Sequence, residues 1–246
     1  MNRHLIGIDF QLDFTAPANY FAGLPQGGSL YVPGAEGDVA RVATMIKKNP
    51  KFFNDIHLTV DSHYRLHVAH ALNWVNSAGE HPAPFTMISV ADVENGTWRA
   101  YKPSRQRIFE NYVKALETNG RYVLVIWPEH CLIGSVGWAI DPVLYEAINF
   151  WEGERYGFAN FVTKGSNNNT EHYSAVVADV QDPQDPSTQL NTSFIQALEE
   201  ADELYITGEA LNFCVANTVT DIADNFKDSS YVSKLVLLED ASSPIP

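Results

Sequence analysis

Short runs of apolar residues recur along the chain, and most are rich in β-branched side chains. They do not alternate with polar positions, which is the pattern expected of strands buried on both faces of a sheet. The runs predict six strands: Leu5–Ile8, Ile56–Val60, Tyr122–Ile126, Phe158–Val162, Leu204–Thr207 and Leu235–Leu238. Apolar residues at helical spacing lie between them and predict helices over Gly37–Lys48, Ser104–Thr118, Pro142–Trp151, Ser193–Ala201 and Phe213–Phe226.

This alternation predicts an α/β fold with a mainly parallel six-stranded sheet flanked by helices on both faces. Two stretches break the alternation, Thr15–Gln26 and Ala71–Tyr101, and we expect them to form loops or lids over a site. The 246 residues suffice for one sizeable core. We therefore expect a single domain over residues 1–246, with an extended insertion around 71–101.

The charge balance narrows the possible partners. The chain has 16 Lys+Arg against 30 Asp+Glu, a formal net charge of −14, and no cluster of cations. Such a surface repels nucleic acid, whose phosphates bind basic patches. No apolar run reaches the ~20 residues of a membrane helix, and the first residues do not resemble a signal peptide. We expect a soluble cytoplasmic protein that binds neither nucleic acid nor membrane; an exposed sheet edge or helix face leaves a homo-oligomer open.

Reactive side chains gather where the predicted strands end. Ligands of α/β proteins bind beyond the carboxyl ends of the strands. Five consecutive predicted strands are followed by such residues: Asp9, Asp61 with His63, His130, Lys164 and Cys214. Because the carboxyl ends of parallel strands share one edge of the sheet, we expect these residues to form a single site.

Cys214 is a candidate nucleophile. Its segment reads as strand, tight turn and first helical turn, where the helix dipole and free amides lower the pKa of a thiol and bind an anion. Only two cysteines occur, Cys131 and Cys214, and a lone cysteine is also common as a small core side chain. Asp9 and Lys164 add a carboxylate and an ammonium for the proton transfers of amide hydrolysis. The three together favour a cysteine hydrolase.

A second group has the composition of a metal site. Two imidazoles and a carboxylate with open coordination positions suit Zn²⁺, Fe²⁺ or Mn²⁺. The candidate ligands are Asp61, His63, His130 and His67, with His70 and His81 as nearby competitors. The aromatic residues Phe14 and Trp127 fall close to these groups; they either enclose a flat ring or pack in the core.

Several segments occur in an order that resembles the nicotinamidases, within the isochorismatase-like cysteine hydrolases. They are Ile8–Phe14, Gly27–Val32, Asp61–His63, Trp127–Cys131 with Gly134 and Gly137, Lys164-Gly165, Tyr173-Ser174, Gly208–Ala210 and Cys214-Val215. The chain departs from the family pattern at Leu12, where Asn is usual, and at Leu211-Asn212, where Thr-Asp is common. The stretch between Asp61 and Trp127 is also longer than in the family.

The resemblance implies an isochorismatase-like hydrolase fold and an activity. The activity is hydrolysis of nicotinamide to nicotinic acid and ammonia through a cysteine thioester, and nicotinic acid would feed NAD salvage. The implied residues are the triad Cys214, Asp9 and Lys164, the oxyanion-hole amides of Ala210 and Cys214, the ring contacts Phe14 and Trp127, and the metal ligands Asp61, His63 and His130, with His67 at a variable fourth position. One divalent ion is implied, with zinc expected first and iron or manganese as alternatives.

Two other functions stay open. An amidase of the same superfamily acting on a carbamoyl or ureido compound would keep the triad without needing the metal. A non-catalytic protein of this fold would bind metal or nicotinamide and release no ammonia. Ammonia release and its dependence on metal separate the three.

Overall fold

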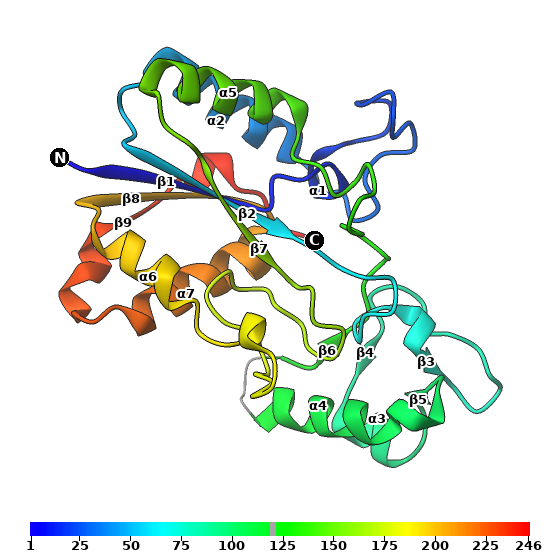
Figure 1. Cartoon of the computed structure of the whole chain (residues 1–246). Coiled ribbons are helices and arrows are strands. Elements are labelled where there is room, and N and C mark those ends of the chain that lie inside the picture. The colour runs from blue at the N-terminus through cyan, green and yellow to red at the C-terminus, as the bar shows by residue number, and fades with distance from the viewer. Residues whose placement is uncertain (119–121) are drawn as a thin grey trace.

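The centre of the computed structural model is a parallel sheet of five strands in the order β7-β2-β1-β8-β9 (Figure 1). The structure describes residues 1–118 and 122–246. The five strands are β1 (Arg3–Ile8), β2 (Asp55–Asp61), β7 (Asn160–Lys164), β8 (Glu203–Gly208) and β9 (Leu235–Leu237). Ile8 pairs with Gly208 and Asp61 pairs with Lys164 in register. The carboxyl ends of four strands therefore meet at one edge, as the sequence predicts.

Helices cover both faces of this sheet (Figure 1). On one face lie α2 (Ala35–Lys48) and α5 (Pro142–Arg155); on the other lie α6 (Thr192–Glu199) and α7 (Ala216–Asn225). The start of α5 is fixed locally, because the Asp141 side chain accepts a hydrogen bond from the Val143 amide and Pro142 occupies the first turn. Each of the five helices predicted from the sequence is present, with ends shifted by a few residues.

The hydrophobic core lies in two layers, one on each side of the sheet. Leu5 of β1 packs in the layer under α2 and α5, whereas its neighbour Ile6 packs in the opposite layer. Both are fully buried. Successive side chains of a strand point to opposite faces, so a strand buried on both sides needs the continuous apolar run seen in the sequence.

The segment between β2 and α5 carries its own short elements. Two antiparallel pairs join β3 (Trp74–Val75) with β5 (Arg99–Ala100), and β4 (Met87–Ile88) with β6 (Leu124–Val125). Helices α3 (Val90–Glu94) and α4 (Gln106–Thr118) pack beside them, and Ser89 and Asp92 form a capping box at the start of α3. The stretch Ala71–Tyr101, expected to form a loop, therefore contains short strands and a helix.

The prediction of six strands in the main sheet is wrong. Of the run Tyr122–Ile126, only Leu124–Val125 forms a strand, and it pairs with β4 outside the main sheet. The Ile126 amide bonds to Thr86 O and the Phe85 amide bonds to Ile126 O, which extends this local pairing. A short apolar run shows that a strand is buried but does not show which partner it takes.

The structure adds one observation on membranes. Within the described residues, no helix combines the length and apolar character needed to cross a membrane.

Candidate active site

The ends of β1, β2 and β7 bring three buried charges into contact. The Lys164 ammonium lies 2.9 Å from Asp9 Oδ2 and 3.2 Å from Asp61 Oδ1, and it donates a hydrogen bond to His172 O at 3.0 Å. All three charged side chains are at most 5% exposed. Asp9 has a φ of 52°, in the left-handed region that non-glycine residues rarely adopt. The structure therefore brings the three side chains together at one edge of the sheet.

The charges in this group fix each other's protonation. Burial disfavours the ammonium, but Asp61 and Asp9 together raise the pKa of Lys164 well above its usual range. Burial raises the pKa of Asp9, and Lys164 opposes that shift. Thr59 Oγ1 donates a 2.5 Å hydrogen bond to Asp9 Oδ1. Asp9 is thus a strengthened base held beside a permanent cation.

Cys214 follows the tight turn at the end of β8. Gly208 has a φ of 135°, and a Cβ there would lie 2.1 Å from Ile8 O, so this position requires glycine. The Glu209–Ala210 peptide is cis. A π-helical turn, Leu211–Val215, carries Cys214 and leads into α7. The Cys214 sulfur lies 3.6 Å from Lys164 Nζ, which joins it to the charged group.

The expected lowering of the Cys214 pKa is not found. Burial raises the pKa of the thiol well above its usual range; Lys164 opposes this, while Asp9 and Asp61 add to it. The helix-dipole argument assumed an exposed thiol, whereas Cys214 is 6% exposed. The resting thiol therefore keeps its proton and needs a base, a role that Asp9 is placed to fill.

Asp61, His63 and His130 form a buried group whose ligand atoms lie within 4.8 Å of one another. His63 Nδ1 bonds to Gly165 O at 3.0 Å and His130 Nδ1 bonds to Pro128 O at 2.8 Å. A carbonyl only accepts, so each Nδ1 is the donor in these bonds, and Nε2 is the nitrogen that would bind a metal in place of any proton it carries. Both Nε2 atoms face Asp61 Oδ2, at 2.9 and 3.5 Å.

The surroundings of Asp61 also suit a cation. The Gln11 side chain donates to Asp61 O and accepts from the Asp61 amide, at 2.8 and 2.7 Å, which holds this residue in place. Although burial opposes a charged imidazole, Asp61 raises the pKa of His63 to about 9. A Cβ at Gly165 would lie 2.6 Å from Asp61 Oδ1, so the glycine leaves room at the carboxylate. These residues fit a divalent ion.

His67 and His70 differ in the nitrogen each leaves free. His67 belongs to a second buried group with His63 and Glu171, but its Nε2 bonds to Thr170 O and its Nδ1 accepts from the Ala69 amide. His70 uses only Nδ1, toward Arg65 O at 3.2 Å, and its buried Nε2 has no hydrogen-bond partner among the described residues. Of these two residues, His70 is thus the one with a free ring nitrogen, whereas His67 is the one whose ligand atom lies within 4.8 Å of that of His63.

His81 lies away from this group. Its ring is exposed, and its Nδ1 bonds to Trp74 O at 2.7 Å.

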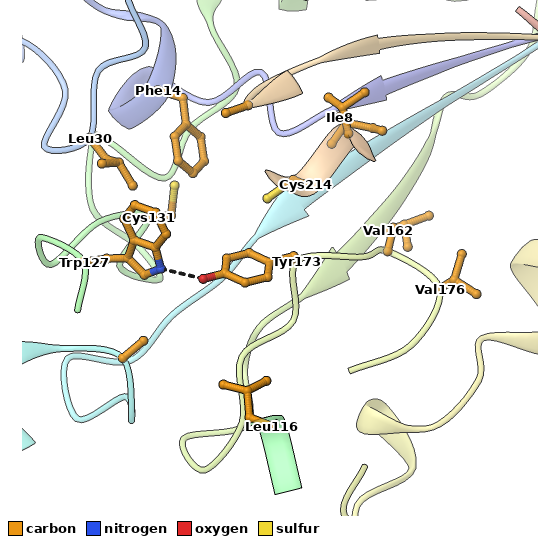
Figure 2. Packing of buried hydrophobic residues seen from close by; sticks show 14 of the residues in the cluster. Ile8, Phe14, Leu30, Leu116, Trp127, Cys131, Val162, Tyr173, Val176 and Cys214 are labelled. Carbon is orange, nitrogen blue, oxygen red and sulfur yellow. Dashed lines mark hydrogen bonds between the residues drawn. The ribbon is translucent and has the colours of Figure 1, made fainter. Parts of the chain in front are cut away.

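Aromatic side chains enclose a narrow cavity next to Cys214. Figure 2 shows the Cys214 sulfur pointing toward Phe14, Trp127 and Tyr173, and the hydrogen bond from Trp127 Nε1 to the Tyr173 hydroxyl oxygen, which is 2.9 Å long. The cavity lining also includes Leu30, Phe213, Asp61, His130, Glu171, Ala210 and Ile245. Phe14 and Trp127 therefore lie in the cavity lining, next to Cys214. Cys131 is fully buried in the core and is absent from this lining.

Five residues of the cavity lining have no role predicted from the sequence, and three of them are Tyr173, Glu171 and Ile245. Tyr173 lies in a segment that matched the family, but no role was attached to it. Glu171 is 4% exposed, and its Oε2 has no hydrogen-bond partner among the described residues; its only signal is its place two positions before Tyr173. Ile245 carries no sequence signal, because it reaches the cavity through tertiary contacts alone.

Known proteins resemble this chain in structure and not in sequence. No protein-family model and no curated protein matches it. An Acinetobacter baumannii nicotinamidase/pyrazinamidase matches with a TM-score of 0.61 and 21% identity, over 100% of this chain and 86% of the other. The yeast nicotinamidase matches with a TM-score of 0.62 and 21% identity, over 99% and 89%.

A third match is a pyrazinamidase from Pyrococcus horikoshii, solved in complex with zinc. Its TM-score is 0.53 and its identity 19%, over 100% of this chain and 88% of the other. At these identities, the likenesses to solved structures establish a shared fold. They confirm the predicted α/β fold, which this chain shares with these nicotinamidases and pyrazinamidases.

Proposed function

We propose that this protein is a metal-dependent amidohydrolase that converts nicotinamide to nicotinic acid and ammonia. The observation that carries the proposal is the contact of Lys164 with Asp9, Asp61 and Cys214 at the carboxyl edge of the sheet. This one cation joins a nucleophile and its base to a metal-binding carboxylate. The fold shared with nicotinamidases and pyrazinamidases supports an amide attached to a flat ring as the substrate.

The first half of the reaction forms a thioester. Asp9 accepts the thiol proton as Cys214 Sγ attacks the carboxamide carbon, and the amides of Ala210 and Cys214 donate to the oxygen that becomes negative. Asp9 then returns the proton to the amide nitrogen, the C–N bond breaks and ammonia leaves. Lys164 stays protonated throughout; it stabilises the negative charge that passes between Asp9 and Cys214.

The second half releases the acid. Water attacks the thioester carbon and gives one proton to Asp9, the C–S bond breaks, and the thiolate recovers the proton from Asp9. The net change is amide plus water to carboxylic acid plus ammonia. Phe14 and Trp127 would contact the two faces of the ring and keep bulk water from the reacting carbon.

The metal would be held by Asp61, His63 and His130, with His70 as an additional ligand. When bound, a divalent ion supplies a Lewis acid for a ring nitrogen or oxygen of the substrate. The donor set of imidazoles and one carboxylate suits zinc, and the Pyrococcus horikoshii pyrazinamidase was solved with zinc.

Ammonia release by cysteine variants tests the proposal. Cys214→Ala should lose activity by at least about 10³-fold, because the nucleophile is gone. Cys131→Ala is the matched control, since it removes the other buried thiol outside the cavity. Chelation should abolish wild-type activity, and zinc should restore it. Equal activity of Cys214→Ala and Cys131→Ala would overturn the proposal, and chelator-resistant hydrolysis of a ureido compound would favour another amidase.

A further inference from the structure

A short segment beyond β9, residues 242–246, lies across the turn that carries Cys214; we call it the strap. The Leu211 amide donates to Ser243 O at 2.8 Å. The Asn212 side chain binds the main chain of Ile245 in both directions: Oδ1 accepts from the Ile245 amide and Nδ2 donates to Ile245 O, each at 3.0 Å. One exposed side chain thus holds the strap beside the active site.

The strap has a second attachment, on the side of α2. The Ser243 amide donates to Glu209 Oε2 at 3.2 Å, and Ser243 Oγ donates to Asp38 Oδ2 at 2.6 Å. Glu209 lies in the turn before Cys214, and Asp38 lies on α2. Side chains from two elements therefore hold a segment that has no helix or strand of its own.

The strap contributes one wall of the active-site cavity. Ile245 lines this cavity together with Cys214 and the core residues Phe14 and Leu30. The cavity has a volume of about 20 Å³, which is room for about one water molecule. A flat ring with a carboxamide is several times larger, so a wall must move before substrate enters.

The cavity walls differ in how firmly they are held. Phe14 and Leu30 are 3% and 6% exposed and pack in the main core. Ile245 is only half-buried, and its main chain is held by Asn212. Breaking those two hydrogen bonds costs less than opening the core.

We propose that the strap is the gate of the substrate cavity, with Asn212 as the positioning residue that latches it and Ile245 as the residue that limits the size of the ring. This inference rests on the proposed amidase function for its substrate class, amides on small flat rings. Ring substituents on the side of Ile245 would be excluded. Asn212 stands at one of the positions where the sequence departs from the family, which gives that departure a structural role.

The size limit is tested with Ile245→Ala and a series of ring-methylated nicotinamides. The ratio of kcat/KM for the best methylated substrate to that for nicotinamide should rise about tenfold, the effect expected for one methyl group in an apolar pocket. Ile108→Ala is the matched control, because Ile108 lies on α4 and is 41% exposed. A ratio equal to that of the control for every methylated substrate would overturn the role of Ile245.

The latch is tested without relying on turnover, by the rate at which iodoacetamide alkylates Cys214, read by peptide mass spectrometry. Asn212→Ala should speed alkylation about tenfold, since losing two hydrogen bonds shifts the opening equilibrium by that order. Hydrogen exchange of the Ile245 amide should accelerate in parallel.

Two further variants complete the latch experiment. Asn212→Asp keeps the acceptor for the Ile245 amide and should restore part of the protection. Asn225→Ala, which removes a side-chain hydrogen bond to Asp221 O at the end of α7, is the control. If Asn212→Ala matches Asn225→Ala, the latch is wrong. If the wild type releases no ammonia, the amidase function is wrong. The alkylation rates still test the gate in that case, because they do not depend on turnover.

Discussion

Lys164 is the residue through which both halves of the active site interact. Its ammonium contacts Asp9 on one side and Asp61 on the other, and the three groups are fully enclosed. A buried charge without its partner is strongly destabilising. Lys164 therefore contributes to stability through the same contacts that join the parts of the candidate site.

Removing this cation should unfold the protein more easily. Lys164→Met leaves two buried carboxylates without their shared partner and should lower the free energy of unfolding by about 3–5 kcal/mol. The double variant Asp9→Asn with Lys164→Met removes one of the stranded charges, so it should regain part of the stability and remain inactive. Urea unfolding of the metal-free proteins measures this. A Lys164→Met variant as stable as wild type would contradict the account.

His70 and His67 are the two candidates for an additional metal ligand, and they differ in their hydrogen bonds. His70 has a free buried Nε2, whereas both nitrogens of His67 bond to the main chain. We expect His70→Ala to weaken zinc binding at least about tenfold and His67→Ala to weaken it less. Competition with a chromophoric chelator gives both affinities, and the opposite order would restore His67 as the ligand.

Sequence and structure agree best for residues that directly follow strands. Asp9, Asp61 and Lys164 could be grouped beforehand because parallel strands share their carboxyl edge. His70 and Ile245 could not be assigned from the sequence. The role of His70 depends on which of its ring nitrogens is hydrogen-bonded to a main-chain carbonyl, and the role of Ile245 depends on the position of a segment that has no secondary structure.

At the level of elements, the turn after β8 packs against α2 through buried carboxyl groups. Burial and the Asp38 carboxylate raise the pKa of Glu209 to about 10. The other groups facing this carboxyl are Arg41, whose guanidinium lies 2.5 Å from Asp38 Oδ1, and Tyr31. Glu209 is therefore neutral at pH 7 and links the strap to the catalytic turn as an uncharged group.

The raised pKa makes this link sensitive to alkali. Folded Glu209 keeps its proton from pH 4.5, its ordinary pKa, up to about 10, while the unfolded chain releases it. Its contribution to stability is thus complete below pH 4.5 and declines as the pH rises toward 10. Glu209→Gln should match wild type at pH 5 and be more stable than wild type at pH 9, because the folded wild type loses up to about 1.4 kcal/mol of stability for each pH unit in this range.

Thermal unfolding at pH 5, 7 and 9 measures this difference. Glu239→Gln, the same change at an exposed carboxyl, is the matched control. A difference between Glu209→Gln and wild type that stays constant with pH would contradict a protonated Glu209.

The elements also show where a sequence pattern stops being informative. Five helices and five strands of the main sheet follow from periodicity. The apolar run Tyr122–Ile126 does not join the main sheet as predicted. Its strand pairs instead with β4, which comes from a stretch expected to be a loop. The same insertion accounts for the long stretch of sequence between Asp61 and Trp127.

Across the whole molecule, the candidate site draws on residues from nearly the entire length of the given sequence. Asp9 lies near the start, Lys164 two thirds of the way along and Ile245 at position 245 of 246. The shared fold with nicotinamidases covers the chain from end to end. The site therefore exists only in the completed sheet, and its chemistry should be lost whenever the global fold is lost.

The most direct measurement is the product balance of the zinc-loaded wild type with nicotinamide. We expect saturable turnover that yields ammonia and nicotinic acid in equal amounts and stops on chelation. A folded, zinc-loaded protein that releases no ammonia from nicotinamide would overturn the proposed amidase function.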